Sequence, residues 1–98
     1  MPTFRKLIDA VDALSALLDV TWKKDDRSGK AASDDLDSAD HIVGLGVDKD
    51  GAVALLRTVA RSKWLRDVRS STLNKRQARM LATAESALAK ALEPTEGQ

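Results

Sequence analysis

FRKLIDAVDALSALLDVTWK, residues 4 to 23, decides the fold class of this chain. Its large apolar side chains recur at steps of three and four residues: Phe4, Leu7, Ile8, Val11, Leu14, Leu18 and Trp22. Charged side chains such as Asp9, Asp12 and Asp19 fall between them. This spacing places one apolar stripe along an α-helix. The pattern predicts an amphipathic helix over residues 3 to 23 that buries one face.

A second periodic segment lies at residues 73 to 93 and predicts another long helix. Its apolar face comprises Leu73, Gln77, Met80, Leu81, Ala84, Ala87, Leu88, Ala91 and Leu92. Thr72 or Asn74 can cap its start, and Asn74 and Gln77 have the spacing of a capping box. Glu93 precedes Pro94, and a residue in that position avoids helical backbone angles. Residues 94 to 98 are expected to form a polar tail.

The stretch ADHIVGLGVDKDGAVALLRTV, residues 39 to 59, allows two interpretations. In the first, a bend at residues 44 to 46 leads into a helix capped by Asp48, because residues 52 to 61 are rich in Ala and Leu and follow the helical period. In the second, residues 42 to 56 form a β-hairpin, because Val43, Leu45 and Val47 alternate with glycines before a turn-forming Asp-Lys-Asp-Gly. The helix is favoured.

That helical pattern breaks near Arg61 or Ser62, where a bend is expected. Trp64, Leu65 and Val68 then predict a short second helical segment. The fold class predicted from the whole sequence is therefore mainly α, with a shorter helical pair between two long amphipathic helices. The alternative is an α+β fold that contains the hairpin at residues 42 to 56.

Residues 24 to 38 are predicted to form a mobile polar loop. Asp, Lys, Ser and Gly dominate this segment, and Leu36 is its only large apolar residue. A loop of this length is unusual in a small domain unless it is functional or disordered.

Length and composition point to one small globular domain over residues 1 to 98. The hydrophobic fraction of 43% and the charged fraction of 32% are typical of a folded soluble protein. The chain has no Cys, which excludes disulfides and thiolate metal sites. The acids at positions 9, 12 and 19 interrupt the first apolar segment, so neither a secretory signal nor a membrane span is expected. A cytoplasmic location is the expectation.

Positive charge is concentrated in the middle of the chain although the total is only +1. Residues 1 to 48 carry 6 basic and 10 acidic side chains, whereas residues 49 to 80 carry 9 basic and 2 acidic ones. The densest part is RTVARSKWLRDVRSSTLNKRQAR, residues 57 to 79, in which Asp67 is the single acid. Solvated helix faces usually intersperse acids that pair with their bases. The imbalance therefore favours a binding surface for an anionic partner.

The candidate binding residues are the eight bases of this stretch and the tryptophan among them. Arginine suits bidentate recognition of phosphate or carboxylate. Trp64 is interpreted first as a core residue, and alternatively as a side chain that stacks on a base or anchors a protein interface. The full set is Arg57, Arg61, Lys63, Trp64, Arg66, Arg69, Lys75, Arg76 and Arg79.

Catalytic and metal chemistry have little support in the sequence. His41 is the only histidine, and its simplest interpretation is a surface position rather than a general base or metal ligand. When Gly51 is aligned with the glycine of a calcium-binding EF-hand loop, Gly46 and Arg57 fall where ligands are required. No enzyme activity, metal or cofactor is predicted.

Residues 44 to 56 also show a weak likeness to a helix-turn-helix, with a glycine turn before a capped helix. Gly44 would interrupt the first helix of such a motif, and the bulky Ile42 occupies a position that usually needs a small residue. These departures disfavour it.

Three functions remain. The first is nucleic-acid binding, DNA or RNA, in which the bases of residues 57 to 79 contact phosphates. The second is a protein-interaction module or small inhibitor that docks on an acidic protein surface. The third is a self-assembling structural protein, because the acidic first half and the basic middle of the chain could meet between copies. Nucleic-acid binding is preferred.

Overall fold

The computed structural model describes residues 3 to 22 and 27 to 93. This part of the chain forms five helices: α1 (Phe4–Thr21), α2 (Arg27–Leu45), α3 (Lys49–Ala60), α4 (Lys63–Ser70) and α5 (Lys75–Leu92). The described residues contain no strand. The mainly-α prediction is therefore confirmed. The hairpin alternative at residues 42 to 56 is wrong, because α2 and α3 occupy most of that segment.

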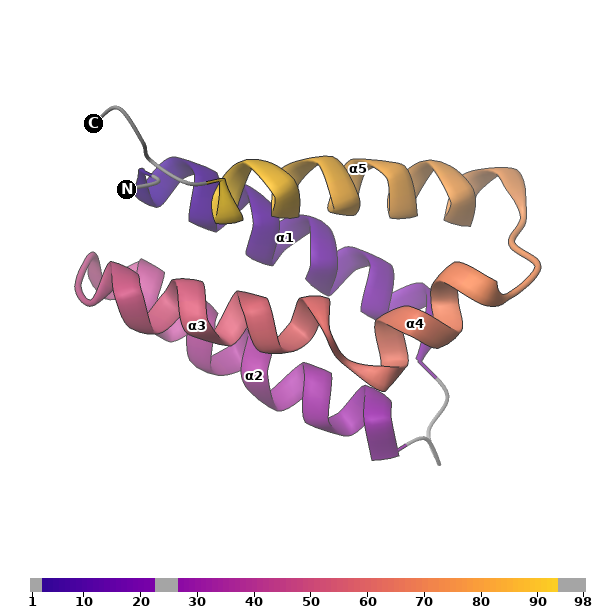
Figure 1. The fold of residues 1–98 in the computed structure, drawn as a ribbon, viewed down its shortest axis with the longest axis horizontal. Coiled ribbons are helices and arrows are strands. Elements are labelled where there is room, and N and C mark those ends of the chain that lie inside the picture. Colours follow the sequence, from indigo (N-terminus) through magenta and orange to yellow (C-terminus); the bar gives the residue numbers. More distant parts are fainter. Residues whose placement is uncertain (1–2, 23–26, 94–98) are drawn as a thin grey trace.

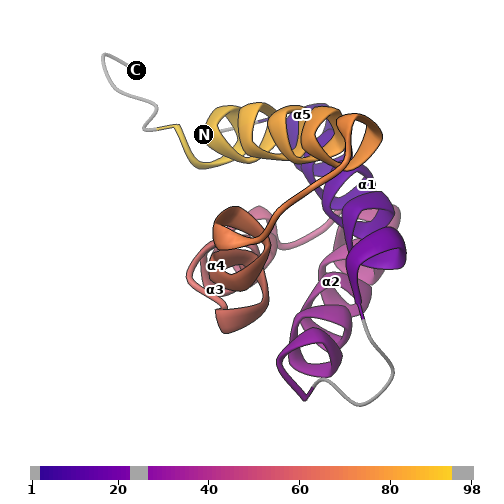
Figure 2. The same cartoon turned by 90° about the vertical axis from the view of Figure 1, so that its right-hand side faces the viewer.

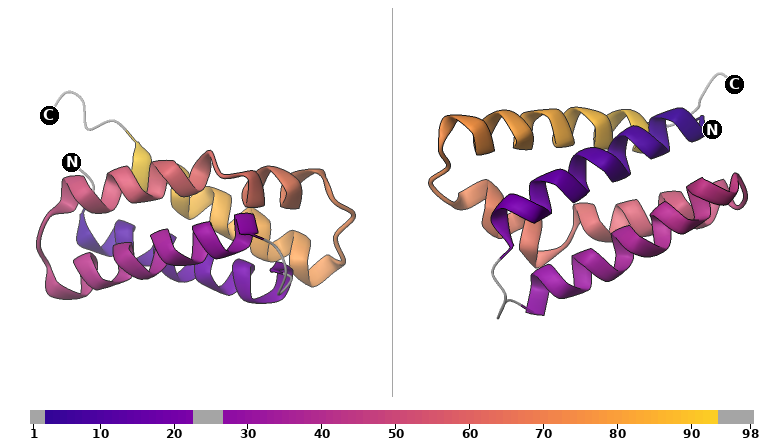
Figure 3. Two further views of the ribbon diagram at one scale, coloured as in Figure 1. Left: turned by 90° about the horizontal axis from the view of Figure 1, so that it is seen from below. Right: turned by 180° about the vertical axis from the view of Figure 1, so that it is seen from behind.

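The helices are arranged as two pairs with α4 at one end (Figure 1). The first and last helices, α1 and α5, lie side by side and run in opposite directions, and α2 and α3 form a second antiparallel pair beneath them. The end-on view shows the two pairs enclosing a common interior, with α4 in front of the end of α3 (Figure 2). Helix α4 lies beyond the end of α3 and packs on α2. Views from below and behind show the same pairing (Figure 3).

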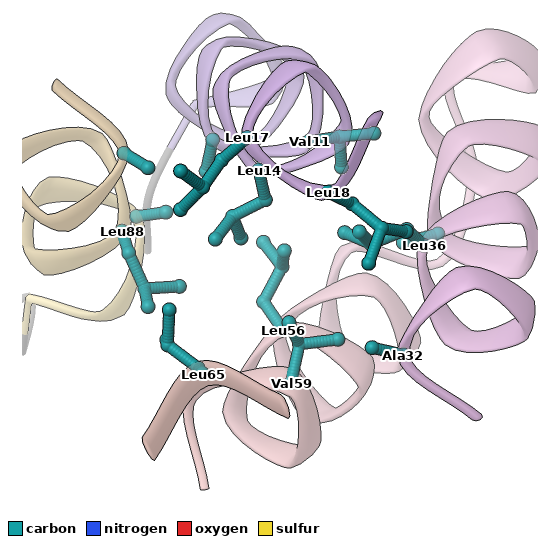
Figure 4. Close-up of a cluster of buried hydrophobic side chains, with 14 of the residues drawn as sticks. Val11, Leu14, Leu17, Leu18, Ala32, Leu36, Leu56, Val59, Leu65 and Leu88 are labelled. Atoms are coloured by element: carbon teal, nitrogen blue, oxygen red, sulfur yellow. The ribbon is translucent and has the colours of Figure 1, made fainter. Parts of the chain in front are cut away.

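The core is apolar and draws side chains from all five helices. Leu14 and Leu17 of α1 point toward Leu56 of α3, Leu65 of α4 and Leu88 of α5 (Figure 4). Among the described residues, no polar or charged residue is buried. Each fully buried leucine contributes about 1.5–3 kcal/mol relative to an exposed one, so this cluster dominates the stability of the fold.

The loop prediction for residues 24 to 38 is wrong from residue 27 onward, because α2 runs through it; residues 24 to 26 lie outside the described part of the chain. The buried face of α2 consists largely of small residues: Gly29, Ala32, Leu36, Ala39 and Val43. Small side chains let this helix pack closely on its neighbours, so it needs few large apolar residues. At Gly29, an added Cβ would lie 1.9 Å from Cδ1 of Trp22.

Helix ends follow the capping residues expected from the sequence. Asp48 accepts a hydrogen bond from the backbone N–H of Gly51 at 3.0 Å and itself adopts a left-handed backbone conformation, with φ of 51°. Ser62 separates α3 from α4, which confirms the bend. The Asn74–Gln77 capping box is present at the start of α5. That helix ends at Leu92, and the predicted polar tail, residues 94 to 98, lies outside the described residues.

Candidate nucleic-acid interface

All eight basic side chains of residues 57 to 79 are exposed. They are carried by three successive helices and the residues that join them. Arg57 belongs to α3 and Arg61 is its C-cap; α4 carries Lys63, Arg66 and Arg69; and the first half of α5 carries Lys75, Arg76 and Arg79.

Three of these bases share a groove between α2 and α3. Arg57, Arg61 and Lys63 line it, and its volume is about 630 Å³. The opposite wall is the first half of α2, which contributes small side chains and one acid, Asp35. Lys63 is paired with Asp67, so the two arginines against the single carboxylate of Asp35 make this groove electropositive.

Only two of the eight basic side chains form ion pairs with other described residues. Lys63 Nζ lies 2.9 Å from Asp67 Oδ2, and the Arg69 guanidinium donates to Glu85 Oε1 through Nε at 2.8 Å and also through Nη2. Arg57, Arg61 and Arg66 have no ion pair among the described residues. These three guanidinium groups are therefore free to bind an external anion, and each has five N–H donors.

The bases of α5 lie in a different place. Arg76 and Arg79 line a second groove, of about 230 Å³, together with Ala13 and Ala16 of α1. Neither arginine lines the groove between α2 and α3. The structure therefore divides the predicted basic stretch into a set on α3 and α4 and a set on α5, and it does not bring all eight side chains onto one groove.

Trp64 is not a surface side chain. Its exposed fraction is 1%, and its indole Nε1 donates a hydrogen bond to Thr21 Oγ1 at 3.0 Å. The core interpretation is correct, and a role in base stacking or interface anchoring is wrong because the ring faces the interior. Phe4 and Trp22, the remaining aromatic residues of the sequence, are half-buried. No exposed aromatic ring therefore accompanies the bases.

Sequence reasoning missed the α2 wall of this groove, including Asp35. The signal was the spacing of Gly29, Ala32, Leu36 and Ala39, which follows the helical period with small residues. The helix-turn-helix considered for residues 44 to 56 is not what the structure has at that place. Instead, α2 and α3 pack side by side along their lengths (Figure 3).

Other chemistry is sparse in the described ranges. No group of three or more His, Cys, Asp or Glu side chains there could hold a metal ion, and His41 is an exposed residue of α2. On the outer side of α2, the Asp34 carboxylate accepts a hydrogen bond from Lys30 Nζ at 2.9 Å and raises the pKa of that lysine above its ordinary value. Across residues 3 to 22 and 27 to 93, no helix has the length and apolar character needed to cross a bilayer.

No protein-family model, curated protein or solved structure matches this chain. Its function therefore has to be inferred from its own side chains.

Proposed function

We propose that this chain is a small non-enzymatic protein that binds nucleic acid through the basic groove between α2 and α3 and the adjoining start of α4. The observation that supports this most strongly is the clustering of Arg57, Arg61 and Lys63 on one groove with a single acid. Arg66, which has no ion pair among the described residues, extends the set along α4. Four cations in succession suit a ligand that carries regularly spaced phosphates.

The preferred ligand is duplex DNA, bound through its backbone. Proteins that hold single strands usually stack bases on exposed aromatic rings. This chain has three aromatic residues, and none is exposed. Phosphate contacts alone position a protein on a duplex without reading its sequence. We therefore expect binding with weak sequence preference and strong salt dependence.

Fluorescence anisotropy of a labelled duplex at several salt concentrations tests this proposal. Four phosphate contacts predict a slope of log K against log salt of about −4. The double variant Arg57→Gln/Arg61→Gln should make the slope shallower by about 2 and weaken binding roughly 10- to 100-fold at about 0.1 M salt.

A matched control removes the same charge from elsewhere. Arg5 and Lys30 are exposed and pair with Asp9 and Asp34, so Arg5→Gln/Lys30→Gln should leave the slope nearly unchanged. Equal effects of the two double variants would place binding outside the groove. No binding to duplex, single-stranded DNA or RNA at about 0.05 M salt would refute nucleic acid as the ligand and favour an acidic protein surface instead.

A further inference from the structure

The outer side of the α1–α5 pair carries one long groove. Two adjoining hollows of about 730 Å³ and 230 Å³ make it up, and both are lined by Ala13 of α1 and Thr83 of α5. Since these two residues belong to both hollows, they mark the middle of a continuous groove. The four bases of the proposed duplex site, Arg57, Arg61, Lys63 and Arg66, do not line it.

The two halves of the groove differ in room and in charge. The narrow half is lined by Arg76, Arg79 and the long apolar side chain of Met80. The wide half is lined by Asp9 and Asp12 and by small side chains, with Lys6 and Lys90 also present. One half is therefore filled and cationic. The other is roomy and has no net charge, because Lys6 and Lys90 balance its two carboxylates; Asp9 also pairs with Arg5 of its own chain at 3.5 Å, whereas Asp12 has no ion pair among the described residues.

A two-fold axis that crosses the middle of such a groove places the narrow half of each copy against the wide half of the other copy. We propose that a second copy of this chain packs on this groove, with the axis passing near Ala13 and Thr83. Arg76 and Arg79 of each copy then lie over Asp9 and Asp12 of the other, and Met80 enters the other copy's wide half. An isologous contact requires a self-complementary surface of this kind.

The available area fits a modest dimer. Helices of 18 residues are about 27 Å long, and two neighbouring helices are about 20 Å wide, which gives each copy about 500 Å² of facing surface. The total of about 1,000 Å² lies at the lower end of specific interfaces. We therefore expect a reversible dimer that weakens as salt rises, because its specificity is largely ionic.

Sedimentation equilibrium across protein concentrations tests the dimer, and charge reversal tests its geometry. The variants Arg76→Asp/Arg79→Asp and Asp9→Arg/Asp12→Arg each place like charges opposite each other, and each should weaken association at least about tenfold. Combining all four substitutions in one chain reverses both halves and should restore the dimer. All four positions are exposed, so circular dichroism should report an unchanged fold.

A steric pair gives an independent test. Thr83→Arg fills the middle of the groove and should abolish the dimer, whereas Ala89→Arg adds the same side chain at an exposed position of α5 outside the groove and should not. A wild-type chain that stays monomeric at about 1 mM, masses that grow beyond the dimer, or a fourfold variant that remains monomeric would each overturn the proposal. Duplex binding by Arg57 and Arg61 does not depend on this face, so the two proposals fail separately.

Discussion

Replacing Trp64 with phenylalanine tests the core at the point where α4 meets α1. The indole is 1% exposed, and its Nε1 donates to Thr21 Oγ1 at 3.0 Å. The hydroxyl of Thr21 in turn donates to the carbonyl of Leu17 at 2.8 Å. Trp64→Phe removes the indole donor and leaves a void beside the last turn of α1.

The expected cost follows from these two losses. Two ring carbons removed from a buried site cost about 1.6 kcal/mol, and the lost hydrogen bond costs about 1 kcal/mol. A destabilisation of about 2–3 kcal/mol lowers the melting temperature of a domain of this size by about 10–20 °C. Far-UV circular dichroism during heating and in urea measures both quantities.

Thr21→Val completes a double-mutant cycle. Alone it leaves the indole N–H of Trp64 without its acceptor, at a cost of about 1–3 kcal/mol. In the Trp64→Phe background that donor is already absent, so the same substitution should cost about 1 kcal/mol less. Duplex affinity should stay within about twofold of wild type in both folded single variants, because neither side chain reaches the basic groove surface.

One result would refute this reasoning. If Trp64→Phe left the melting temperature unchanged and weakened duplex binding about tenfold or more, the ring would be a surface contact for the ligand rather than a core residue.

Two further predictions concern close packing on α2 and charge in the basic groove. Gly29→Ala should destabilise the fold by about 1–3 kcal/mol, because the new Cβ would lie 1.9 Å from Cδ1 of Trp22. Gly44→Ala should instead stabilise α2 by about 0.5–1 kcal/mol, because no atom lies within 4 Å of its new Cβ. Thermal melts of the two variants measure both effects. Asp35→Asn should tighten duplex binding about fivefold, since it removes about 1 kcal/mol of repulsion from the acid that lines the groove, and anisotropy would contradict the proposed site if affinity fell.

Large apolar side chains made α1 and α5 predictable from sequence. Leu7, Leu14 and Leu88 mark their faces without ambiguity, and Asn74 supplied the start of α5. The bend at Ser62 was also predictable, because charged residues fell on what would otherwise be the apolar side of α3.

The helix α2 escaped prediction for a physical reason. Gly29, Ala32 and Ala39 bury little area each, so average hydrophobicity reports a polar segment even though the residues follow the helical period. Their contribution comes from the close approach of neighbouring helices, which only the assembled structure shows.

The exposure of the candidate bases could be predicted from their residue type. Their separation into one set on α3 and α4 and another on α5 could not. Arg57 faces α2 and Arg76 faces the α1 side of α5, and these directions depend on which flank of each helix meets which neighbour. Tertiary arrangement sets that choice, and no spacing within residues 57 to 79 encodes it. The preferred interpretation of Trp64 as a core residue is correct, and Leu65 and Val68 are buried with it.

The pairing of α1 with α5 has a consequence for the folding of the chain during its synthesis. Gln77 Nε2 donates to the carbonyl of Val20 at 3.3 Å, a contact that spans 57 positions in sequence. The α2–α3 pair, by contrast, is joined by a short turn and can form from local contacts. During synthesis, part of the apolar stripe of α1 therefore stays in water until α5 leaves the ribosome. We expect nascent chains that lack α5 to depend on chaperones and to aggregate more readily than the complete folded chain.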